Sequence, residues 1–377
     1  MKNIWSIFKN VLRYCMAVLV GAGILFTGTF YVFTGDALSF VKIFKTFYIV
    51  EHFSAVPVDK ATLLDGALAG IVQKLDDRHS LYVGGNQYDE LKEETDGSYG
   101  GIGVYLSVRE DKPVVIGVVA GEPADLSGVK RGDVIMAIDG EGVNGVAIDV
   151  ISRKIRGSVG SSVQLTLDES GNEKNVTIER KQIPLTTVVG KMMDNQIGYI
   201  RIGMFSGHTG QEFADAYQKL QGEGMKKMIV DLRYNPGGLV AQAVAVADVF
   251  IPANTIVSIV DRDGNMEEYQ TTHSPETMPT VVLVNENSAS AAEILAGAVQ
   301  DLKLGTIVGV KSYGKGTVQN IFSLNQQEAI KLTVAKYATP SGKFIDGVGI
   351  IPDVEVKNSD TDTEDYQLKK ALELLNQ

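Results

Sequence analysis

The spacing of apolar residues changes several times along the chain and predicts a different structure in each part. Residues 14–35 carry no charged side chain and are mostly apolar. From Phe40 to Leu91, apolar residues recur every three or four positions, which is typical of amphipathic helices. Glycine-rich turns and short apolar runs follow, and from Val188 onward strand-like runs alternate with helical ones. The pattern predicts residues 1–36 as a cytoplasmic stub and transmembrane anchor, 37–97 as a helical lead-in, 98–183 as a mainly-β domain, 184–357 as an α/β domain, and 358–377 as an acidic linker and C-terminal helix.

The first apolar run is long enough to span a membrane, since about 20 helical residues cross a ~30 Å hydrocarbon core. Lys2, Lys9 and Arg13 precede the run and Asp36 follows it, so the positive-inside rule places the amino terminus in the cytoplasm. We predict a single transmembrane helix that stays attached. A cleaved signal peptide is the alternative, but residues 27–33 are too bulky for the usual small-residue cleavage site.

One helix of the lead-in carries an apolar stripe. Its members are Leu63, Leu64, Ala67, Leu68, Ile71, Val72 and Leu75. Asp59 or Thr62 is the expected N-cap, because a short polar side chain accepts a hydrogen bond from the free backbone N–H groups of the first turn. The stripe predicts either packing within the chain or a dimerisation face.

A glycine-rich loop at Tyr99–Val104 opens the mainly-β domain and leads into a strand at Val104–Val108. A dinucleotide-binding fingerprint would need a helix after the loop, so the strand argues against that function. Further expected elements are strands at 114–119, 163–167 and 175–180, a short helix ending near Gly128, and a helix at 147–156.

Together with Glu122-Pro123-Ala124, Gly132–Ile135 and Ile138-Asp139-Gly140, this loop resembles a PDZ domain of the bacterial-protease type. Such a domain binds an extended peptide by strand addition, and its loop N–H groups hold the terminal carboxylate. The resemblance implies that the peptide-binding residues are Gly100, Gly101, Ile102 and Gly103.

The α/β domain is predicted to contain a substantially parallel sheet, because its strands and helices alternate. The expected strands are 197–202, 227–232, 255–260, 280–284, 306–310 and 329–338, and the expected helices are 210–221, 239–248 and 291–300.

A serine-containing segment in this domain favours acyl-transfer chemistry. The buried strand Val281–Val284 runs through a small-residue turn into the helix that begins at Ala291, so Ser288 or Ser290 lies near a helix N-terminus. Free N–H groups and the helix dipole stabilise developing negative charge there. Lys315, which lies between two glycines, is a candidate general base.

A second turn, Asp231–Gly238, joins a strand to a helix and ends in Pro236-Gly237-Gly238. Its exposed backbone N–H groups, at Gly237 and Gly238, are suited to form one half of an oxyanion hole. The N–H of Ala291 is the expected other half. A plain strand-to-helix turn is the alternative.

Three motifs together resemble the carboxyl-terminal processing peptidases, the tail-specific proteases of serine peptidase family S41. These are Asp231–Gly238, Ser288–Ile294 and Gly314–Gln319, and the likeness covers about residues 50–357. The resemblance implies a ClpP/crotonase-like layered α/β core with an inserted PDZ domain. It also implies Ser290 as nucleophile, Lys315 as base and Gln319 as the residue that orients the lysine amine. Ala292 replaces a further serine that relatives usually carry and that is not their nucleophile.

Lysine acts as a base only when it is neutral, so this mechanism requires Lys315 to be desolvated. A serine–histidine–acid triad is the rival chemistry. The four histidines, His52, His79, His208 and His273, are scattered and lie in no motif that resembles a triad partner.

Composition excludes several other functions. A net charge of −11 and a pI near 5.0 argue against an extended nucleic-acid surface. Cys15 is the only cysteine, which excludes an internal disulfide and a cysteine-rich zinc site, and the histidines lack metal-ligand spacing. We expect no metal and no cofactor.

These observations predict a membrane-anchored serine endopeptidase of a bacterial cell. Its catalytic domain would lie outside the cytoplasm, and its PDZ domain would capture proteins by their carboxyl termini. A catalytically inactive PDZ adaptor is the alternative, and an acyl-CoA enzyme is a third reading based on fold relationship. A homodimer or a regulatory partner is an open expectation. The acidic segment Asp360–Asp365 is expected to be a solvated link to a helix at Leu368–Leu375, with a contact to a second copy as the alternative.

Overall fold

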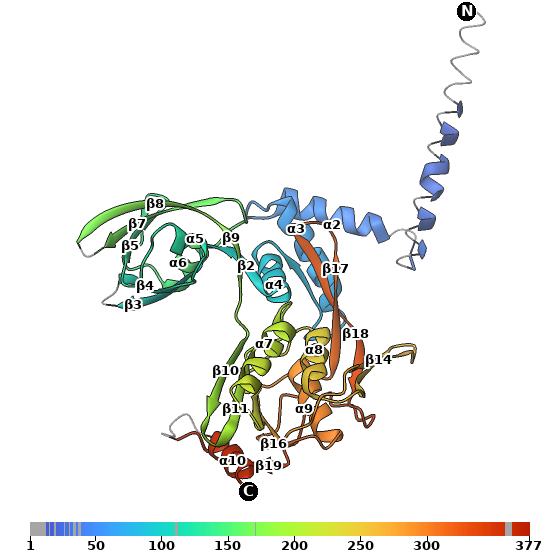
Figure 1. The fold of residues 1–377 in the computed structure, drawn as a ribbon. Coiled ribbons are helices and arrows are strands. Elements are labelled where there is room, and N and C mark those ends of the chain that lie inside the picture. Colours follow the sequence, from blue (N-terminus) through green and yellow to red (C-terminus); the bar gives the residue numbers. More distant parts are fainter. Residues whose placement is uncertain are drawn as a thin grey trace, which may run out of the picture. The chain divides into compact units, whose positions relative to one another are not determined.

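The computed structural model describes most of the chain (Figure 1). The described residues are 13–14, 16–18, 20–25, 27–29, 31–32, 35–36, 39–109, 112–169, 171–358 and 364–377. The chain divides into two units, Met1–Tyr82 and Val83–Gln377, and each is described by itself.

The first unit contains the helices α2 (Ser39–Phe53) and α3 (Lys60–Gln73). Asp59 is the N-cap of α3, as predicted, and its carboxylate accepts a hydrogen bond from the Thr62 N–H at 3.1 Å. Within the described unit, the apolar stripe of α3 is largely exposed: Leu64 and Ile71 face solvent, and Val72 is its buried member. The expected packing of the whole stripe is therefore not seen in this unit.

The predicted membrane anchor is described only in part, because Cys15, Leu19, Phe26, Phe30 and residues 33–34 lie outside the described residues. In the part of the chain that is described, no helix has both the length and the apolar character required to cross a membrane.

A short strand and a helix precede the mainly-β domain. The strand β1 (Leu81–Gly84) was not predicted, since its residues fall in a stretch with helical spacing. The helix α4 (Asn86–Asp96) follows and ends at Gly97, whose φ of +68° stops the helix in the left-handed conformation.

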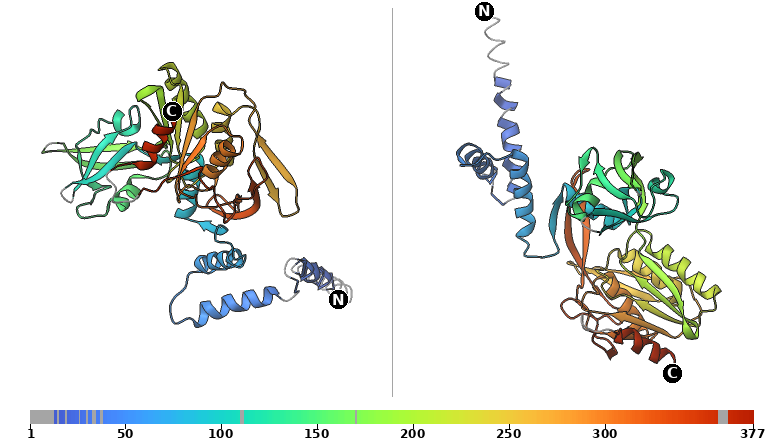
Figure 2. Two further views of the ribbon diagram at one scale, coloured as in Figure 1. Left: turned by 90° about the horizontal axis from the view of Figure 1, so that it is seen from below. Right: turned by 90° about the vertical axis from the view of Figure 1, so that its left-hand side faces the viewer.

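The mainly-β domain is a curved sheet around one core (Figure 2). Its elements are β3 (Val104–Arg109), β4 (Lys112–Val118), α5 (Pro123–Leu126), β5 (Val134–Ile138), β6 (Glu141–Gly142), α6 (Ile148–Ile155), β7 (Ser162–Glu169) and β8 (Asn172–Glu179). The strand order is β3-β4-β5-β7-β8, with β6 paired to β5, and all pairs are antiparallel. Two strands at the ends of this domain, β2 (Ser98–Gly101) and β9 (Lys181–Pro184), pair with each other and close it.

The α/β domain has a six-stranded sheet in the order β10-β11-β12-β15-β16-β19. Its elements are β10 (Val188–Met193), the 3-10 turn Asp194–Gln196, β11 (Ile197–Ile202), α7 (Thr209–Gly222), β12 (Lys227–Asp231), α8 (Val240–Phe250), β15 (Thr280–Val284), α9 (Ala291–Asp301), β16 (Thr306–Gly309), β19 (Val354–Glu355) and α10 (Tyr366–Leu375). From β11 to β19 the strands are parallel, and β10 is an antiparallel edge. The predicted parallel sheet is confirmed.

Both faces of this sheet are covered, as a parallel sheet requires. Met228 and Val230 pack with residues of α7, α8 and α9, whereas Ile229, between them, packs with α10 on the opposite face. Parallel pairing puts the carboxyl ends of β12 and β15 side by side, with Asp231 opposite Leu283. The two predicted active-site turns therefore leave the same edge of the sheet.

Two predicted strands of the α/β alternation belong to a separate antiparallel sheet. Here β13 (Thr255–Asp261) pairs with β14 (Met266–Gln270) and with β18 (Glu328–Ala338), and β18 pairs with β17 (Thr317–Ser323). The short turns between β13 and β14 and between β17 and β18 explain the antiparallel pairing, since parallel neighbours need a longer crossover. Strand β17, which carries Gln319, was not predicted.

The acidic segment near the C-terminus is not simply a solvated link. Residues 359–363 lie outside the described residues, but Asp365 is the N-cap of α10 and accepts a hydrogen bond from the Leu368 N–H. Arg233 donates to Asp365 at 2.8 Å and to Asp231 at 2.7 Å. This partly buried ion cluster joins α10 to the end of β12.

Candidate active site

Ser290 lies where β15 turns into α9 and is the N-cap of that helix. Its φ of +55° and ψ of −117° lie in a region that side chains with a Cβ rarely adopt. Strain of this kind persists only where the surrounding structure enforces it, and it concentrates at functional sites. The conformation points to a constrained serine at the start of a helix.

Ser288 has a structural role. It is fully buried, its hydroxyl donates to the Leu232 carbonyl at 2.8 Å, and it accepts from the Asn285 N–H at 2.9 Å. Ser290, by contrast, is partly exposed and lines a cavity. The structure thus favours Ser290 over Ser288 as the reactive hydroxyl.

Lys315 lies on a loop whose two glycines are required by its shape. Gly314 has a φ of +86°, which favours glycine. A Cβ on Gly316 would lie 2.4 Å from the backbone nitrogen of Asp346, so the loop packs too closely there for any side chain. The two glycines thus allow the lysine loop to pack closely against neighbouring backbone, and their role is more than flexibility.

Gln319 lies on β17 and its amide is held in one orientation. The amide nitrogen donates to the Thr317 hydroxyl at 2.9 Å and to the Thr333 hydroxyl at 3.2 Å. Both donations use the nitrogen end, so the carbonyl oxygen points to the other side and is available as an acceptor.

Glu293, which the sequence analysis did not single out, connects the two segments. It is fully buried in the first turn of α9. One carboxylate oxygen accepts from the Ser290 N–H at 2.8 Å and the Lys315 N–H at 2.9 Å. The other accepts from the Ser312 hydroxyl at 2.5 Å and the Gly314 N–H at 2.7 Å. Burial raises the pKa of Glu293, and these hydrogen bonds oppose the shift.

A signal for Glu293 was present in the sequence. Ser290-Ala291-Ala292-Glu293 has the spacing of a capping box, in which the fourth residue accepts a hydrogen bond from the backbone N–H of the first. That pattern predicts the Ser290 contact. It does not predict the contacts to the lysine loop, which is far away in sequence.

The Asp231–Gly238 turn packs directly against Ser290. A Cβ on Gly237 would lie 2.7 Å from the Ser290 Cβ, and Gly238, with φ +135°, leaves no room for a Cβ beside the Phe205 carbonyl. The Gly237 N–H donates to the Asn235 side chain at 2.8 Å. Among the described residues, the N–H groups of Gly238 and Ala291 have no such partner, so these two, unlike Gly237, stay candidates for the predicted oxyanion hole.

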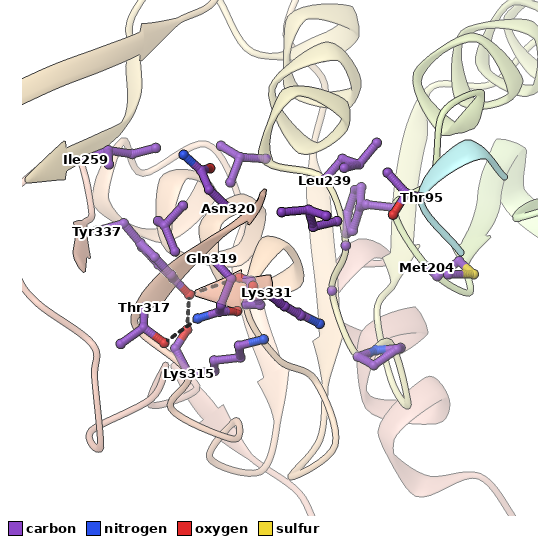
Figure 3. A pocket seen from close by; sticks show the side chains of 18 of the residues that line it. Thr95, Met204, Leu239, Ile259, Lys315, Thr317, Gln319, Asn320, Lys331 and Tyr337 are labelled. Carbon is purple, nitrogen blue, oxygen red and sulfur yellow. Dashed lines mark hydrogen bonds between the residues drawn. The ribbon is translucent and has the colours of Figure 1, made fainter. Parts of the chain in front are cut away.

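These groups surround one cavity of about 480 Å³ (Figure 3). Lys315, Thr317, Gln319 and Tyr337 gather at one side of it, and Thr95 and Met204 lie at the other. The lining also includes Leu91, Phe205, Pro236, Gly237, Gly238, Leu239, Val240, Ile259, Tyr269, Ser290, Val318, Asn320, Ile321 and Lys331. The structure therefore brings Ser290, Lys315 and Gln319 into one mainly apolar cavity, and no histidine lines it.

The sequence matches known families over both domains. Residues 196–356 match peptidase family S41 and residues 100–179 match a PDZ domain. The carboxy-terminal processing protease CtpA of Bacillus subtilis (strain 168) is 36% identical over 330 residues, which cover 87% of this chain and 71% of CtpA. The chain belongs to peptidase family S41.

Other S41 proteins agree with this assignment. The carboxy-terminal processing protease CtpB of Bacillus subtilis (strain 168) is 33% identical over 341 residues, covering 88% of this chain and 71% of CtpB. The solved structure of a photosystem II D1 C-terminal processing protease superposes with a TM-score of 0.51 at 28% identity, over 90% of this chain and 91% of that one. This S41 chain is a serine peptidase of the carboxy-terminal processing type with a PDZ domain.

The predicted peptide-binding residues of the S41 chain lie where β2 enters the PDZ domain. Gly100 and Gly101 belong to β2 and pair with Gln182 and Lys181 of β9. Ile102 is buried in the PDZ core, and Gly103, with a φ of +78°, turns the chain into β3. Peptide binding at these residues stays a prediction.

Proposed function

We propose that this S41 peptidase cleaves polypeptides near their carboxyl termini with a Ser290–Lys315 dyad. The observation that carries the proposal is that both residues line one cavity, together with Gln319 and the Gly237-Gly238 turn. Several apolar side chains share that cavity, among them Leu239 and Val240. An apolar environment disfavours the charged ammonium form of a lysine. It therefore favours the neutral amine that a lysine base requires.

In the first half of the reaction, the Ser290 hydroxyl oxygen attacks the scissile carbonyl carbon and its proton passes to the neutral Lys315 amine. The tetrahedral oxyanion accepts hydrogen bonds from the N–H groups of Gly238 and Ala291 at the start of α9. The Lys315 ammonium then gives its proton to the leaving nitrogen as the C–N bond breaks. An acyl ester on Ser290 and a free carboxyl-terminal fragment result.

In the second half, Lys315 is again neutral and accepts a proton from a water molecule, which attacks the ester carbonyl. As this second oxyanion collapses, the ester C–O bond breaks and the Lys315 ammonium returns its proton to the Ser290 oxygen. The new carboxyl terminus is released. The Gln319 carbonyl oxygen is suited to accept a hydrogen bond from the amine and so to orient it. The hydrogen bonds from the Gln319 amide nitrogen to Thr317 and Thr333 support that role, because they fix the orientation of the amide.

The PDZ domain is proposed to recognise the substrate by its carboxyl terminus, with Gly100, Gly101, Ile102 and Gly103 at the binding loop. Strand addition beside such a loop is the usual PDZ mode, which supports this reading. Hydrolysis rather than a pure adaptor function is favoured by the intact Ser290, Lys315 and Gln319.

The uncharged run at residues 14–35, with Lys2, Lys9 and Arg13 before it, supports a further proposal about location. The chain would be a single-pass protein of a bacterial cell membrane, and its peptidase domain would lie on the extracytoplasmic side. The ClpP/crotonase-like layering of the catalytic domain stays a prediction, as does any homodimer or regulatory partner.

The experiment is cleavage of an internally quenched peptide that ends in two apolar residues. Ser290→Ala and Lys315→Ala are each expected to abolish turnover, while Ser290→Ala still binds the peptide. Ser323→Ala and Lys226→Ala, at exposed positions away from the cavity, are the matched controls and should keep wild-type rates. Full turnover by Ser290→Ala or by Lys315→Ala would refute the dyad.

A further inference from the structure

Tyr337 joins the same two segments that Glu293 joins. It lies on β18, is 1% exposed, and its hydroxyl lies 2.6 Å from the Lys315 carbonyl oxygen and 3.0 Å from the Ser290 carbonyl oxygen. Its own N–H donates to the Gly316 carbonyl at 3.0 Å. Burial and the nearby charges of Glu293 and Asp346 raise the pKa of Tyr337, so the phenol keeps its proton.

Glu293 and Tyr337 are complementary. The carboxylate of Glu293 accepts hydrogen bonds from the N–H groups of Ser290 and Lys315. The phenol of Tyr337 shares its one proton between the carbonyl oxygens of these same two residues, with the shorter contact to Lys315. Both backbone polar groups of Ser290 and of Lys315 are thus held by two side chains, which belong to two different elements.

We propose that Glu293 and Tyr337 are positioning residues of this peptidase, which set the distance between the Ser290 hydroxyl and the Lys315 amine by fixing the backbone of both. This inference rests on the dyad proposed above. Neither side chain needs to touch the substrate, because each acts through Ser290 and Lys315. Fixed geometry of this kind matters because small misplacements of reacting groups lower rates steeply.

The four contacts of Glu293 define its chemical form. All four partners, three backbone N–H groups and the Ser312 hydroxyl, can donate, and the Ser312 oxygen itself accepts from the Ile350 N–H. A side chain whose two oxygens both accept hydrogen bonds, from four donors in all, is an ionised carboxylate. A glutamine in its place would direct its NH₂ group against at least one backbone N–H, whichever way the amide was turned.

Other charged groups surround the lysine loop. Lys331 lines the cavity, and Asp346 accepts from the Gly316 N–H at 3.3 Å and lies 3.5 Å from the Lys336 amine. Because Tyr337→Phe removes no charge, a change in the pH profile of that variant would report a change in the position or solvation of Lys315. It would not report altered electrostatics from these neighbours.

Tyr337→Phe is the sharpest test, since it keeps the buried ring and removes only the hydroxyl. We expect kcat to fall by about 100-fold, as for other small misplacements of catalytic groups, with little change in KM. The rising limb of the pH profile should move to higher pH, because a lysine that is no longer held in the cavity is better solvated and harder to deprotonate. Glu293→Gln, a second variant, should lower kcat further.

Two controls separate positioning from stability. Tyr217→Phe removes another buried hydroxyl, one that has no hydrogen-bond partner among the described residues and lies on α7. Glu212→Gln removes a carboxylate that accepts from the N–H groups of Thr187 and Val188, remote from the cavity. Both controls should keep the wild-type pH profile, and Glu212→Gln should lower the melting temperature.

The full chain is assayed with the quenched peptide, and rates are expressed per folded protein as measured by near-UV circular dichroism. The inference is overturned if folded Tyr337→Phe and Glu293→Gln keep the wild-type kcat and the wild-type rising limb of the pH profile, while Ser290→Ala and Lys315→Ala are inactive. It is also overturned if the two controls lose kcat to the same extent. Turnover by Lys315→Ala would instead refute the dyad itself.

Discussion

The guanidinium of Arg233 lies 2.8 Å from the carboxylate of Asp365, and this pair joins the active-site turn to the C-terminal helix. Arg233 also pairs with Asp231, whose carboxylate accepts from the Tyr199 hydroxyl at 2.6 Å. Arg233 follows β12 by two residues and precedes Gly237 by four. The helix α10 is therefore part of the support of the turn that borders Ser290.

Asp365→Asn tests this support, because asparagine still caps α10 but cannot form the ion pair. Arg233 and the cap hydrogen bonds lower the pKa of Asp365 to about 2 from 3.8, although burial opposes the shift. The pair therefore contributes its full stability above about pH 4, and that contribution is lost as the pH falls through about 2. We expect the variant to lose ~1 kcal/mol of unfolding free energy at pH 7, after allowance for solvent screening of the partly exposed carboxylate.

Urea unfolding at pH 7 and near pH 3 measures this difference, which should shrink at the lower pH. Asp149→Asn is the control, since its pair with Arg153 is well exposed and should contribute little. Equal stability of wild type and Asp365→Asn at pH 7 would contradict the role assigned to the pair.

Gly238→Ala should disrupt the turn beside Ser290. The added Cβ would lie 2.0 Å from the Phe205 carbonyl oxygen at a φ of +135°, so the backbone must move. We expect peptidase activity to be lost and stability to fall by roughly 2 kcal/mol or more. Gly222→Ala is the matched control, because the space around this last residue of α7 is open and its φ is ordinary. A variant Gly238→Ala with normal kcat would show that the turn tolerates displacement.

Ser288→Ala separates the structural serine from the reactive one. It removes the donor to the Leu232 carbonyl and leaves the buried Asn285 N–H without its acceptor. Loss of such a partner costs about 1–3 kcal/mol, so the melting temperature should fall clearly. Activity per folded molecule should stay within about tenfold of wild type, as for a stability defect alone. Complete inactivity of folded Ser288→Ala would place this hydroxyl in the chemistry.

Removal of residues 14–35 tests the proposed anchor. With them, we expect the protein in the membrane fraction of bacterial cells, resistant to extraction by high salt and released by detergent. External protease should cleave it in intact spheroplasts. Without residues 14–35 the chain should be found in the soluble fraction. A full chain that is salt-extractable would contradict a transmembrane anchor.

The sequence predicted the elements that depend on local pattern. The strands β11 and β15 have the predicted bounds, and α9 begins at Ala291 as expected, because apolar period and turn chemistry are properties of neighbouring residues. Less was predicted where partners are distant. Strand β17 has a polar, exposed pattern that local spacing does not mark as a strand, and only its pairing with β18 defines it.

By itself, the sequence determined the family, the order of its domains and a short list of candidate catalytic residues. Only the tertiary structure gave Ser288 a buried structural role, paired the Gly237 N–H with the Asn235 side chain, and joined the backbone of Ser290 to that of Lys315 through Glu293 and Tyr337. The physical reason is that buried hydrogen bonds between segments far apart in the chain leave no periodic trace in the residues that form them.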